Sequence, residues 1–236
     1  MTETTKTLAQ QTSQHDPVLR LGRLDVCAVS DAMDQLGLTG CVSGLDQRAS
    51  RRRIAGRVLT MRLVAKDQAP AQTGAPRHLG TTAIESAQAG DIIVVEQRSG
   101  IEAGSWGGIL SLAAKVRGIA GVICDGPVRD IDEARQYDFP VYARGLTART
   151  ARGRIAEAAT NGPVLVGDVT VNASDFAIAD ASGVVFIRAA DIERLLDAAE
   201  SIVAREAAMA KALLAGEPVS KVMGANYEFM LAAGSP

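Results

Sequence analysis

Aromatic residues are scarce in this chain of 236 residues. They make up 3% of it and include a single tryptophan, so few side chains can stack against the bases of single-stranded nucleic acid. Basic residues are not in excess either, because 25 Lys and Arg stand against 27 Asp and Glu, a formal net charge of -2. Since phosphate backbones are bound by surplus positive charge, both shortages argue against nucleic acid as the principal ligand.

Cysteine and histidine are also rare. The three cysteines, Cys27, Cys41 and Cys124, are odd in number and never form a C-x-x-C pair. This excludes a disulfide framework and a thiolate zinc site, and it favours a reducing, cytoplasmic compartment. The two histidines, His15 and His78, exclude an H-E-x-x-H motif or a histidine-rich zinc site.

Long apolar runs are absent from the sequence. No segment has the roughly 20 consecutive apolar residues that cross a bilayer, so we expect no membrane association. Residues 1–16 are polar, rich in Thr and Gln, and lack the apolar segment of a signal peptide. We expect them to form a flexible tail, and we expect residues 17–236 to form one α/β domain, since the length suits a single large domain.

What the chain does contain is an alternation of short apolar strands and amphipathic helices. Helices are expected within Pro17–Leu38, at Ile109–Val116 and at Asp191–Ala215, and strands at Arg57–Val64, Asp91–Glu96, Ile119–Cys124, 141–142, 164–171 and 184–187. The segment Lys66–His78 has two prolines and no periodicity, which predicts a long loop. Strand, helix and strand between residues 91 and 124 predict a crossover unit with parallel strands.

A glycine-rich turn at Gly104–Gly108 precedes the helix of this crossover unit. Glycines at a helix start leave the backbone amides unobstructed, so the amides of Gly107, Gly108, Ile109 and Leu110 can hold a carboxylate or phosphate oxygen. The alternative is a purely structural tight turn. The segment is neither G-x-G-x-x-G nor a Walker loop, which argues against a dinucleotide or nucleoside triphosphate.

Arg129 and Asp130 follow the second strand of the unit. A planar cation beside a hard oxygen ligand can bind the carboxylate of a 2-oxo acid together with a divalent metal. The alternative is an aspartate at a helix start beside a solvated arginine. Asp125 precedes Gly126, and we expect it to hydrogen-bond its own backbone in a turn.

The run from Gly104 to Asp130, G-S-W-G-G-I-L-S-L-A-A-K-V-R-G-I-A-G-V-I-C-D-G-P-V-R-D, resembles the RraA-like family. The catalytic members of that family are the class II 4-hydroxy-4-methyl-2-oxoglutarate/4-carboxy-4-hydroxy-2-oxoadipate aldolases. Further blocks in the style of the family are found at Leu24–Leu38, Ala89–Val95, Phe139–Gly145 and Ala179–Ile187. The resemblance implies a swivelling-type β/β/α sandwich in a single domain, here with a long C-terminal helix, assembled as a homotrimer or homohexamer.

The resemblance also implies an activity. It is that of a divalent-metal-dependent lyase that cleaves a small 2-oxo acid through a pyruvate enolate, by retro-aldol cleavage of a 4-hydroxy-2-oxo acid or by decarboxylation of the oxaloacetate type. Asp130 would bind Mg²⁺ or Mn²⁺, Arg129 would contact the pyruvyl unit, and the amides of residues 107–110 would hold its carboxylate. A metal-bound or nearby ordered water is the candidate for moving the proton, since the pocket offers no obvious histidine base. His78 either lines the pocket or lies on the surface of its loop.

Two positions of the sequence bear on this activity. Many aldolases of the family carry an acidic residue where this chain has Gly108, so a carboxylate that organises metal-bound water is expected to be missing. In the aldolases a glutamate from a neighbouring subunit approaches the metal, and Glu206 on the last helix is its match here. The alternative for Glu206 is a solvated helix charge.

Two other functions stay open at this point. The namesake of the family binds and inhibits RNase E, so one alternative is a non-catalytic protein that binds and regulates a partner such as a ribonuclease. The other is a lyase for a different keto acid, which Gly108 and the loop Lys66–His78 would admit. The enzyme requires a metal at Asp130, whereas the regulator does not.

Overall fold

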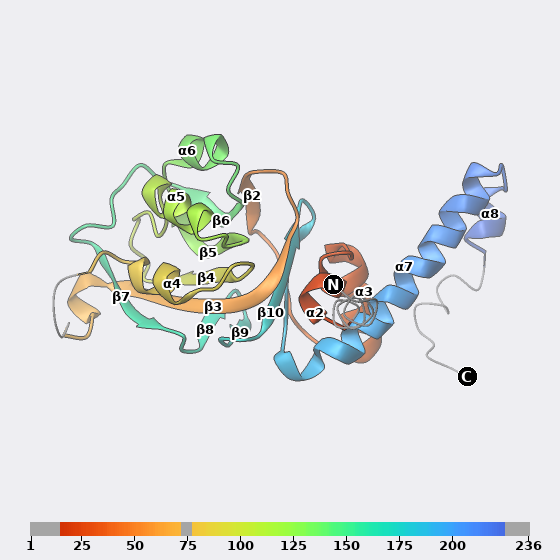
Figure 1. Ribbon diagram of the computed structural model, residues 1–236, viewed down its shortest axis with the longest axis horizontal. Helices are drawn as coiled ribbons and strands as arrows, with labels where there is room; N and C mark the ends of the chain where they lie inside the picture. The colour runs from red at the N-terminus through yellow and green to blue at the C-terminus, as the bar shows by residue number, and fades with distance from the viewer. Residues whose placement is uncertain (1–14, 72–76, 225–236) are drawn as a thin grey trace, which may run out of the picture.

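The computed structural model describes residues 15–71 and 77–224 (Figure 1). Most of the expected tail, residues 1–14, lies outside this range. The helices are α2 (Pro17–Leu21), α3 (Val26–Leu36), η1 (Lys66–Gln68), α4 (Thr81–Ser86), α5 (Gly108–Val116), α6 (Ile131–Gln136), η2 (Ala189–Asp191), α7 (Ile192–Leu214) and α8 (Val219–Val222). The strands are β1 (Cys41–Val42), β2 (Asp46–Ala49), β3 (Ile54–Ala65), β4 (Ile92–Gln97), β5 (Gly121–Val128), β6 (Val141–Leu146), β7 (Ile155–Thr160), β8 (Val164–Val166), β9 (Val169–Val171), β10 (Phe176–Asp180) and β11 (Gly183–Ile187).

The centre of the fold is a parallel run of four strands, β3-β4-β5-β6, within a sheet of order β1-β11-β10-β3-β4-β5-β6-β2. The residues of β4 from Ile92 to Val95 have no exposed surface, as expected for a parallel strand covered on both faces. Helix α5 links β4 to its parallel neighbour β5. The predicted crossover unit is therefore confirmed.

Side chains on the two faces of the sheet belong to different cores. Ile93 and Val95 of β4 pack in a core with residues of α4, α5 and α6, whereas Ile92 and Val94 share a core with residues of β8, β9, β10 and β11. Figure 1 shows the three short helices on one side of the sheet and β8 and β9 on the other. The chain is a single α/β domain with the β/β/α layering that the family resemblance implies.

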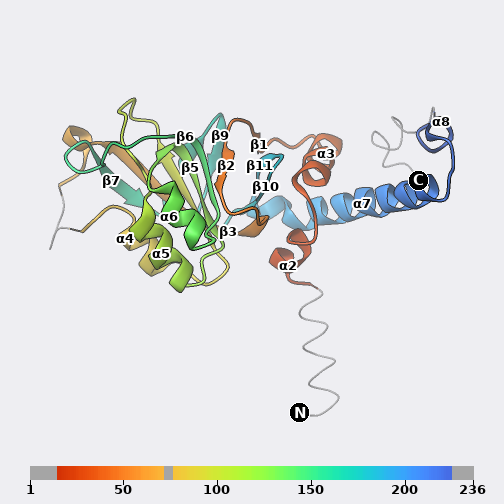
Figure 2. The same ribbon diagram turned by 90° about the horizontal axis from the view of Figure 1, so that it is seen from above.

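A third group of helices lies at the end of the sheet. Helices α2, α3 and α7 pack against β10 and β11 around Leu21, Phe176, Ile187 and Leu195. The 23-residue helix α7 confirms the predicted long C-terminal helix. Its second half extends away from the rest of the domain and leads to α8, as Figures 1 and 2 show. In the described part of the chain, no helix combines the length and the hydropathy that a membrane span requires.

The strand and helix predictions were wrong or incomplete in several places. The stretch 164–171 folds as two strands, β8 and β9, and β1, β2, β7 and β10 were not predicted. Helix α4 follows directly on the expected loop and was not predicted, because T-T-A-I-E-S offers only two apolar residues in six. Strand β5 does not end at Cys124 but continues through Asp125 to Val128. The register of β5 against β6 shifts between Cys124 and Pro127. After this shift β5 stays paired with β6 up to Val128, the residue before Arg129.

Candidate active site

The candidate site lies where the parallel neighbours β4 and β5 end. The glycine turn leads from β4 into α5, and Arg129 and Asp130 lead from β5 into α6. Two backbone bonds join these segments: the Arg129 amide donates to the Trp106 carbonyl at 3.0 Å, and the Ser105 amide donates to the Pro127 carbonyl at 2.8 Å. In such sheets, the crevice beyond the carboxyl ends of the strands is the usual binding position.

A cavity of about 270 Å³ is lined by both segments. It brings together six of the seven residues predicted for the site, namely Gly107, Gly108, Ile109, Leu110, Arg129 and Asp130. The indole of Trp106 forms part of the wall, and it is 2% exposed and stacked on Phe139 with ring centroids 6.5 Å apart. The two segments therefore form one concave site on a packed base.

The side chain of Arg129 lies across Gly104. A Cβ atom on this glycine would be 2.7 Å from Cγ and 2.9 Å from Cδ of the arginine, so only glycine leaves room for the stem. Nε of Arg129 contacts both carboxylate oxygens of Asp130, at 3.2 and 3.1 Å. Within the described residues its two terminal nitrogens have no hydrogen-bond partner, and about a third of the side chain is exposed. A planar pair of donors therefore remains for a ligand carboxylate.

Asp130 occupies the N-cap position of α6 but does not cap that helix. Its carboxylate instead accepts a hydrogen bond from the Gly108 amide, at 3.2 Å, in the first turn of α5. The backbone of Asp130 is left-handed, with φ 53° and ψ 39°, a conformation that costs energy for any residue except glycine and is least costly for Asn and Asp. This geometry disagrees with the alternative of an ordinary helix-start aspartate, since the strained backbone directs the carboxylate to the glycine turn.

The start of α5 presents its amides to the cavity. Gly107 is the N-cap in an extended conformation, and no side chain caps the helix from that position. The turn is braced from behind, because Trp106 Nε1 donates to Ser111 Oγ and that hydroxyl donates to the Gly107 carbonyl, both at 3.0 Å. With the Gly108 amide bonded to Asp130, the amides of Ile109 and Leu110 are left to bind an anion at the positive end of the helix dipole.

A carboxylate does lie beside position 108. The sequence has no acidic residue there, but Glu133 from the first turn of α6 fills the space, and a Cβ atom on Gly108 would be 1.8 Å from its Oε2. Position 108 itself offers no carboxylate, but α6 places one beside it. The sequence could have indicated Glu133, because it follows Asp130 by three residues. This spacing places Asp130 and Glu133 on one side of α6.

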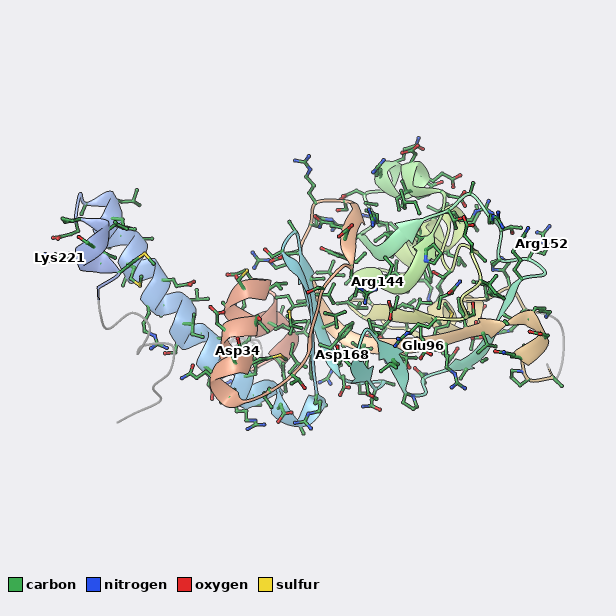
Figure 3. All side chains as sticks on the ribbon, turned by 180° about the vertical axis from the view of Figure 1, so that it is seen from behind. Asp34, Glu96, Arg144, Arg152, Asp168 and Lys221 are labelled. Atoms are coloured by element: carbon green, nitrogen blue, oxygen red, sulfur yellow. The ribbon has the colours of Figure 1, made fainter. Side chains whose placement is uncertain are left out.

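Three further polar residues line the cavity and were not predicted as site residues: His78, Thr150 and Arg152. Nδ1 of His78 lies 2.8 Å from the carbonyl of Leu79, and since a carbonyl only accepts, this nitrogen carries the proton and Nε2 is the basic one. Of the two positions that the sequence left open for His78, the structure shows the one at the cavity. Arg152 comes from the loop after β6 and lies at the end of the molecule opposite Lys221 (Figure 3).

Glu206, the seventh predicted residue, does not lie at this cavity. It belongs to the second half of α7, which extends away from α5 and α6. Burial raises the pKa of its carboxyl, and the charges of Asp25 and Asp31 at α3 raise it further. In one chain Glu206 therefore faces other carboxylates, and a role at a metal requires a second copy of the chain, as expected from the resemblance.

Asp125 has a structural role that the sequence did not indicate. It is buried in β5, where its carboxylate accepts hydrogen bonds from Arg144 Nε at 2.6 Å and from the Gly167 amide at 2.8 Å. The prediction of a local turn was wrong, because both partners come from segments distant in sequence. Arg144 is labelled near the centre of Figure 3. Cys124 beside it is fully buried, which raises the pKa of its thiol to about 12, as expected for an unreactive core cysteine.

The donors of the cavity suit a hydrated divalent cation. Within residues 15–71 and 77–224 no group of three or more His, Cys, Asp or Glu side chains converges as a ready-made metal cage. Mg²⁺ does not need one, because it keeps several waters and is bound through one or two carboxylates. The side chain of Asp130 is 33% exposed, and its carboxylate lies beside the glycine turn. These oxygen donors fit Mg²⁺ or Mn²⁺ and do not fit a soft metal.

Comparison with known proteins supports the same family. The chain is 27% identical over 202 residues to a Halalkalibacterium halodurans protein named "Putative 4-hydroxy-4-methyl-2-oxoglutarate aldolase", covering 84% of this chain and 89% of that protein. It is 26% identical over 159 residues to protein DlpA of Legionella pneumophila, which covers 67% of this chain but only 25% of the much longer DlpA.

A solved structure shows the same fold. The crystal structure of Streptomyces coelicolor RraAS2, titled an unusual member of the RNase ES inhibitor RraA protein family, superposes with a TM-score of 0.71 at 22% identity, covering 81% of this chain and 94% of that one. The family model described as Aldolase/RraA matches residues 26–186, which include every element of the cavity. This match confirms the resemblance seen in the sequence, and the chain belongs to the RraA-like family.

Proposed function

We propose that this protein is a divalent-metal-dependent carbon-carbon lyase that releases pyruvate from a small 2-oxo acid. The observation that carries the proposal is that Arg129, Asp130 and the first residues of α5 line one cavity, with the Asp130 carboxylate bonded to the Gly108 amide. A guanidinium and two helix amides bind the two polar ends of a 2-oxo carboxylate, and the carboxylate of Asp130 binds a hard cation. The aldolase name of the Halalkalibacterium halodurans relative is in accord with this chemistry.

The reaction breaks the bond between C3 and C4 of the substrate. In a retro-aldol cleavage the 4-hydroxyl loses its proton, C4 leaves as a carbonyl, and the electron pair of the broken bond forms the enolate of pyruvate. In oxaloacetate, C4 leaves as carbon dioxide and the same enolate forms. A proton then adds to C3 and gives pyruvate.

Each protein group has a part in this scheme. The amides of Ile109 and Leu110 hold the C1 carboxylate, and the guanidinium of Arg129 hydrogen-bonds the oxygen that becomes negative as the bond breaks. Asp130 would hold the divalent cation, which would supply further positive charge to stabilise the enolate. Nε2 of His78 is the basic nitrogen among the lining side chains, and it accepts the proton of the 4-hydroxyl directly or through water.

Pyruvate release in a lactate dehydrogenase-coupled assay tests the proposal. Oxaloacetate and 4-hydroxy-4-methyl-2-oxoglutarate are offered with Mg²⁺, with Mn²⁺ or with EDTA, and Asp130→Asn is run beside the wild type. Asparagine tolerates the left-handed backbone at this position, so the variant removes the charge without the strain of other substitutions. We expect metal-dependent turnover that Asp130→Asn lowers by at least about 10²-fold. Equal turnover with EDTA, or in the variant, contradicts the proposal.

A second function is favoured by one surface. Helix α5 exposes Ile109 (75%), Leu112 (38%) and Val116 (79%) on its outer side, and apolar side chains gathered on one helix face are typical of protein-binding surfaces. A non-catalytic regulator of a partner such as a ribonuclease would use this face and would need no metal at Asp130. Two results together would favour this function. The protein would show no turnover with either substrate, and both the wild type and the Asp130→Asn variant would inhibit a ribonuclease.

A further inference from the structure

We propose that Glu133 is a second acidic residue of this site and holds the divalent cation together with Asp130. This inference rests on the proposed function, because it assigns a further residue to the same metal-dependent site. It goes beyond the residue pair that the sequence indicated, and it is carried by the packing of α6 against the glycine turn.

Three glycines of the turn each make room for one side chain of the segment that follows β5. A Cβ atom would be 2.7 Å from Cγ of Arg129 at Gly104, and 2.8 Å from Oδ2 of Asp130 at Gly107. At Gly108 the corresponding atom is Oε2 of Glu133, at 1.8 Å. A Cβ at any of the three positions would displace the side chain that lies there. The Glu133 carboxylate thus lies against Gly108 as the Asp130 carboxylate lies against Gly107.

The Glu133 carboxylate is available for a ligand. Asp130 is engaged by Arg129, and Asp132 on the same helical turn is engaged by Arg135 at 2.9 Å. Glu133 has no ion pair or side-chain hydrogen bond within residues 15–71 and 77–224. A hollow of about 390 Å³ next to the cavity is lined by both Asp130 and Glu133, which leaves space for a cation with its waters.

Charge balance explains why a cation belongs there. The charged side chains that line the cavity and the adjoining hollow are the guanidinium groups of Arg129 and Arg152 and the carboxylates of Asp130, Asp132 and Glu133. Their formal charges leave an excess of one negative charge, so the side chains alone give an anionic 2-oxo acid no net attraction. A divalent cation held by Asp130 and Glu133 would make the site positive. Glu133 thus lowers the affinity for the acid in the absence of metal and raises the affinity for the metal itself.

Mn²⁺ binding to the full-length protein tests the assignment without an activity assay. Trp106, the only tryptophan, lines the cavity, so paramagnetic Mn²⁺ quenches its emission on binding. We expect Glu133→Gln to weaken Mn²⁺ binding by about 10- to 100-fold. The matched control is Glu217→Gln, the same substitution at a side chain that is 41% exposed and lines neither the cavity nor the hollow, and its Mn²⁺ affinity should equal that of the wild type.

A rescue variant separates metal binding from a merely structural role. In Gly108→Asp/Glu133→Ala the carboxylate comes from the turn itself, and we expect it to recover most of the Mn²⁺ affinity that Glu133→Ala loses. Wild-type affinity in Glu133→Gln would overturn the assignment of Glu133 while leaving the proposed function intact. Failure of the wild type to bind Mn²⁺ would overturn the proposed function, and this inference with it.

Discussion

Arg129 and Gly104 are in direct contact, since a Cβ atom on the glycine would lie 2.7 Å from Cγ of the arginine. Gly104→Ala should therefore displace the guanidinium from the mouth of the cavity, and a displacement of about 1 Å at a reacting group can cost 10²-fold in rate. We expect kcat/KM for oxaloacetate to fall by about 10- to 100-fold.

The control for Gly104→Ala is Gly145→Ala in β6. No atom lies within 4 Å of a Cβ at Gly145, and alanine stiffens the unfolded chain in the same way at both positions. Equal kinetics of the two variants would mean that the stem of Arg129 has room to move and that Gly104 does not position it.

Arg129→Lys tests the planar pair of donors. An ammonium cannot form two parallel hydrogen bonds to a carboxylate or enolate oxygen, and a hydrogen bond to a charged group contributes about 1.5–3 kcal/mol. We expect kcat/KM to fall by roughly 10²-fold. Arg135→Lys on the exposed side of α6 is the control, and a rate for Arg129→Lys equal to this control would argue that the charge alone is needed.

His78→Gln tests the proton acceptor. Glutamine keeps a polar group at the cavity but cannot accept the proton, and general-base catalysis contributes about 10²–10⁴-fold. We expect kcat to fall by about 10²-fold with little change in KM. His15→Gln changes the other histidine, at the start of α2 and outside the residues that line the cavity. An unchanged kcat in His78→Gln would mean that an ordered water, and not His78, accepts the proton.

Glu206→Gln tests the like-charge contact of α7 with α3. Burial and the charges of Asp25 and Asp31 raise the pKa of Glu206, so its ionised form lowers the stability of the folded chain above that pKa. We expect a higher Tm for the variant at pH 7 than for the wild type, and no difference at a pH where Glu206 is protonated. The Mn²⁺ affinity of Glu206→Gln, measured on the oligomer, tests the expected role of Glu206 at the metal site of a neighbouring subunit. A lower affinity than that of the wild type would support this role.

Ion pairs of Arg20 join α2 to α7, and they make the stability of the fold depend on pH. Its three guanidinium nitrogens contact Glu193, Asp197 and Glu200 at 2.6–2.9 Å, and the hydrogen bond from Arg20 lowers the pKa of Glu200. Because the folded-state pKa lies below the unfolded one, this contribution is complete above about pH 5 and is lost as the pH falls through the folded-state pKa.

The comparison of wild type with Arg20→Ala measures that contribution. We expect the free energy of unfolding to differ by about 1 kcal/mol at pH 7, since the acidic partners are largely exposed. Urea unfolding at pH 7 and pH 3 checks the prediction, and the difference should shrink at pH 3. An equal difference at both values would assign the effect to the packing of the Arg20 stem.

Apolar patterns predicted most of the fold. The run Ile92–Val95 is buried in full, and the apolar residues in the first half of α7, from Ile192 to Ile202, pack on β10 and β11 as their spacing indicates. The same spacing continues to Leu213 and Leu214, but these two side chains are exposed. The failures have a common cause. Asp125 was predicted to lie in a turn because its neighbour is glycine, but its partners are Arg144 of β6 and Gly167 of the turn between β8 and β9. Local sequence carries no information on such partners, whose positions follow from the sheet as a whole.

By itself, the sequence determined that two strand-to-helix junctions are neighbours. Parallel strands joined by one helix bring their carboxyl ends together whatever the surrounding detail, so Arg129 and Asp130 had to meet the turn at Gly107 and Gly108. Only the tertiary structure decided which side chain enters each gap that a glycine leaves. That choice depends on the placement of α6 against α5 to within about an ångström, the scale on which packed side chains exclude one another. For that reason only the structure shows that Glu133 lies beside Gly108 and that His78 lines the cavity, while the predicted role of Glu206 requires a second copy of the chain.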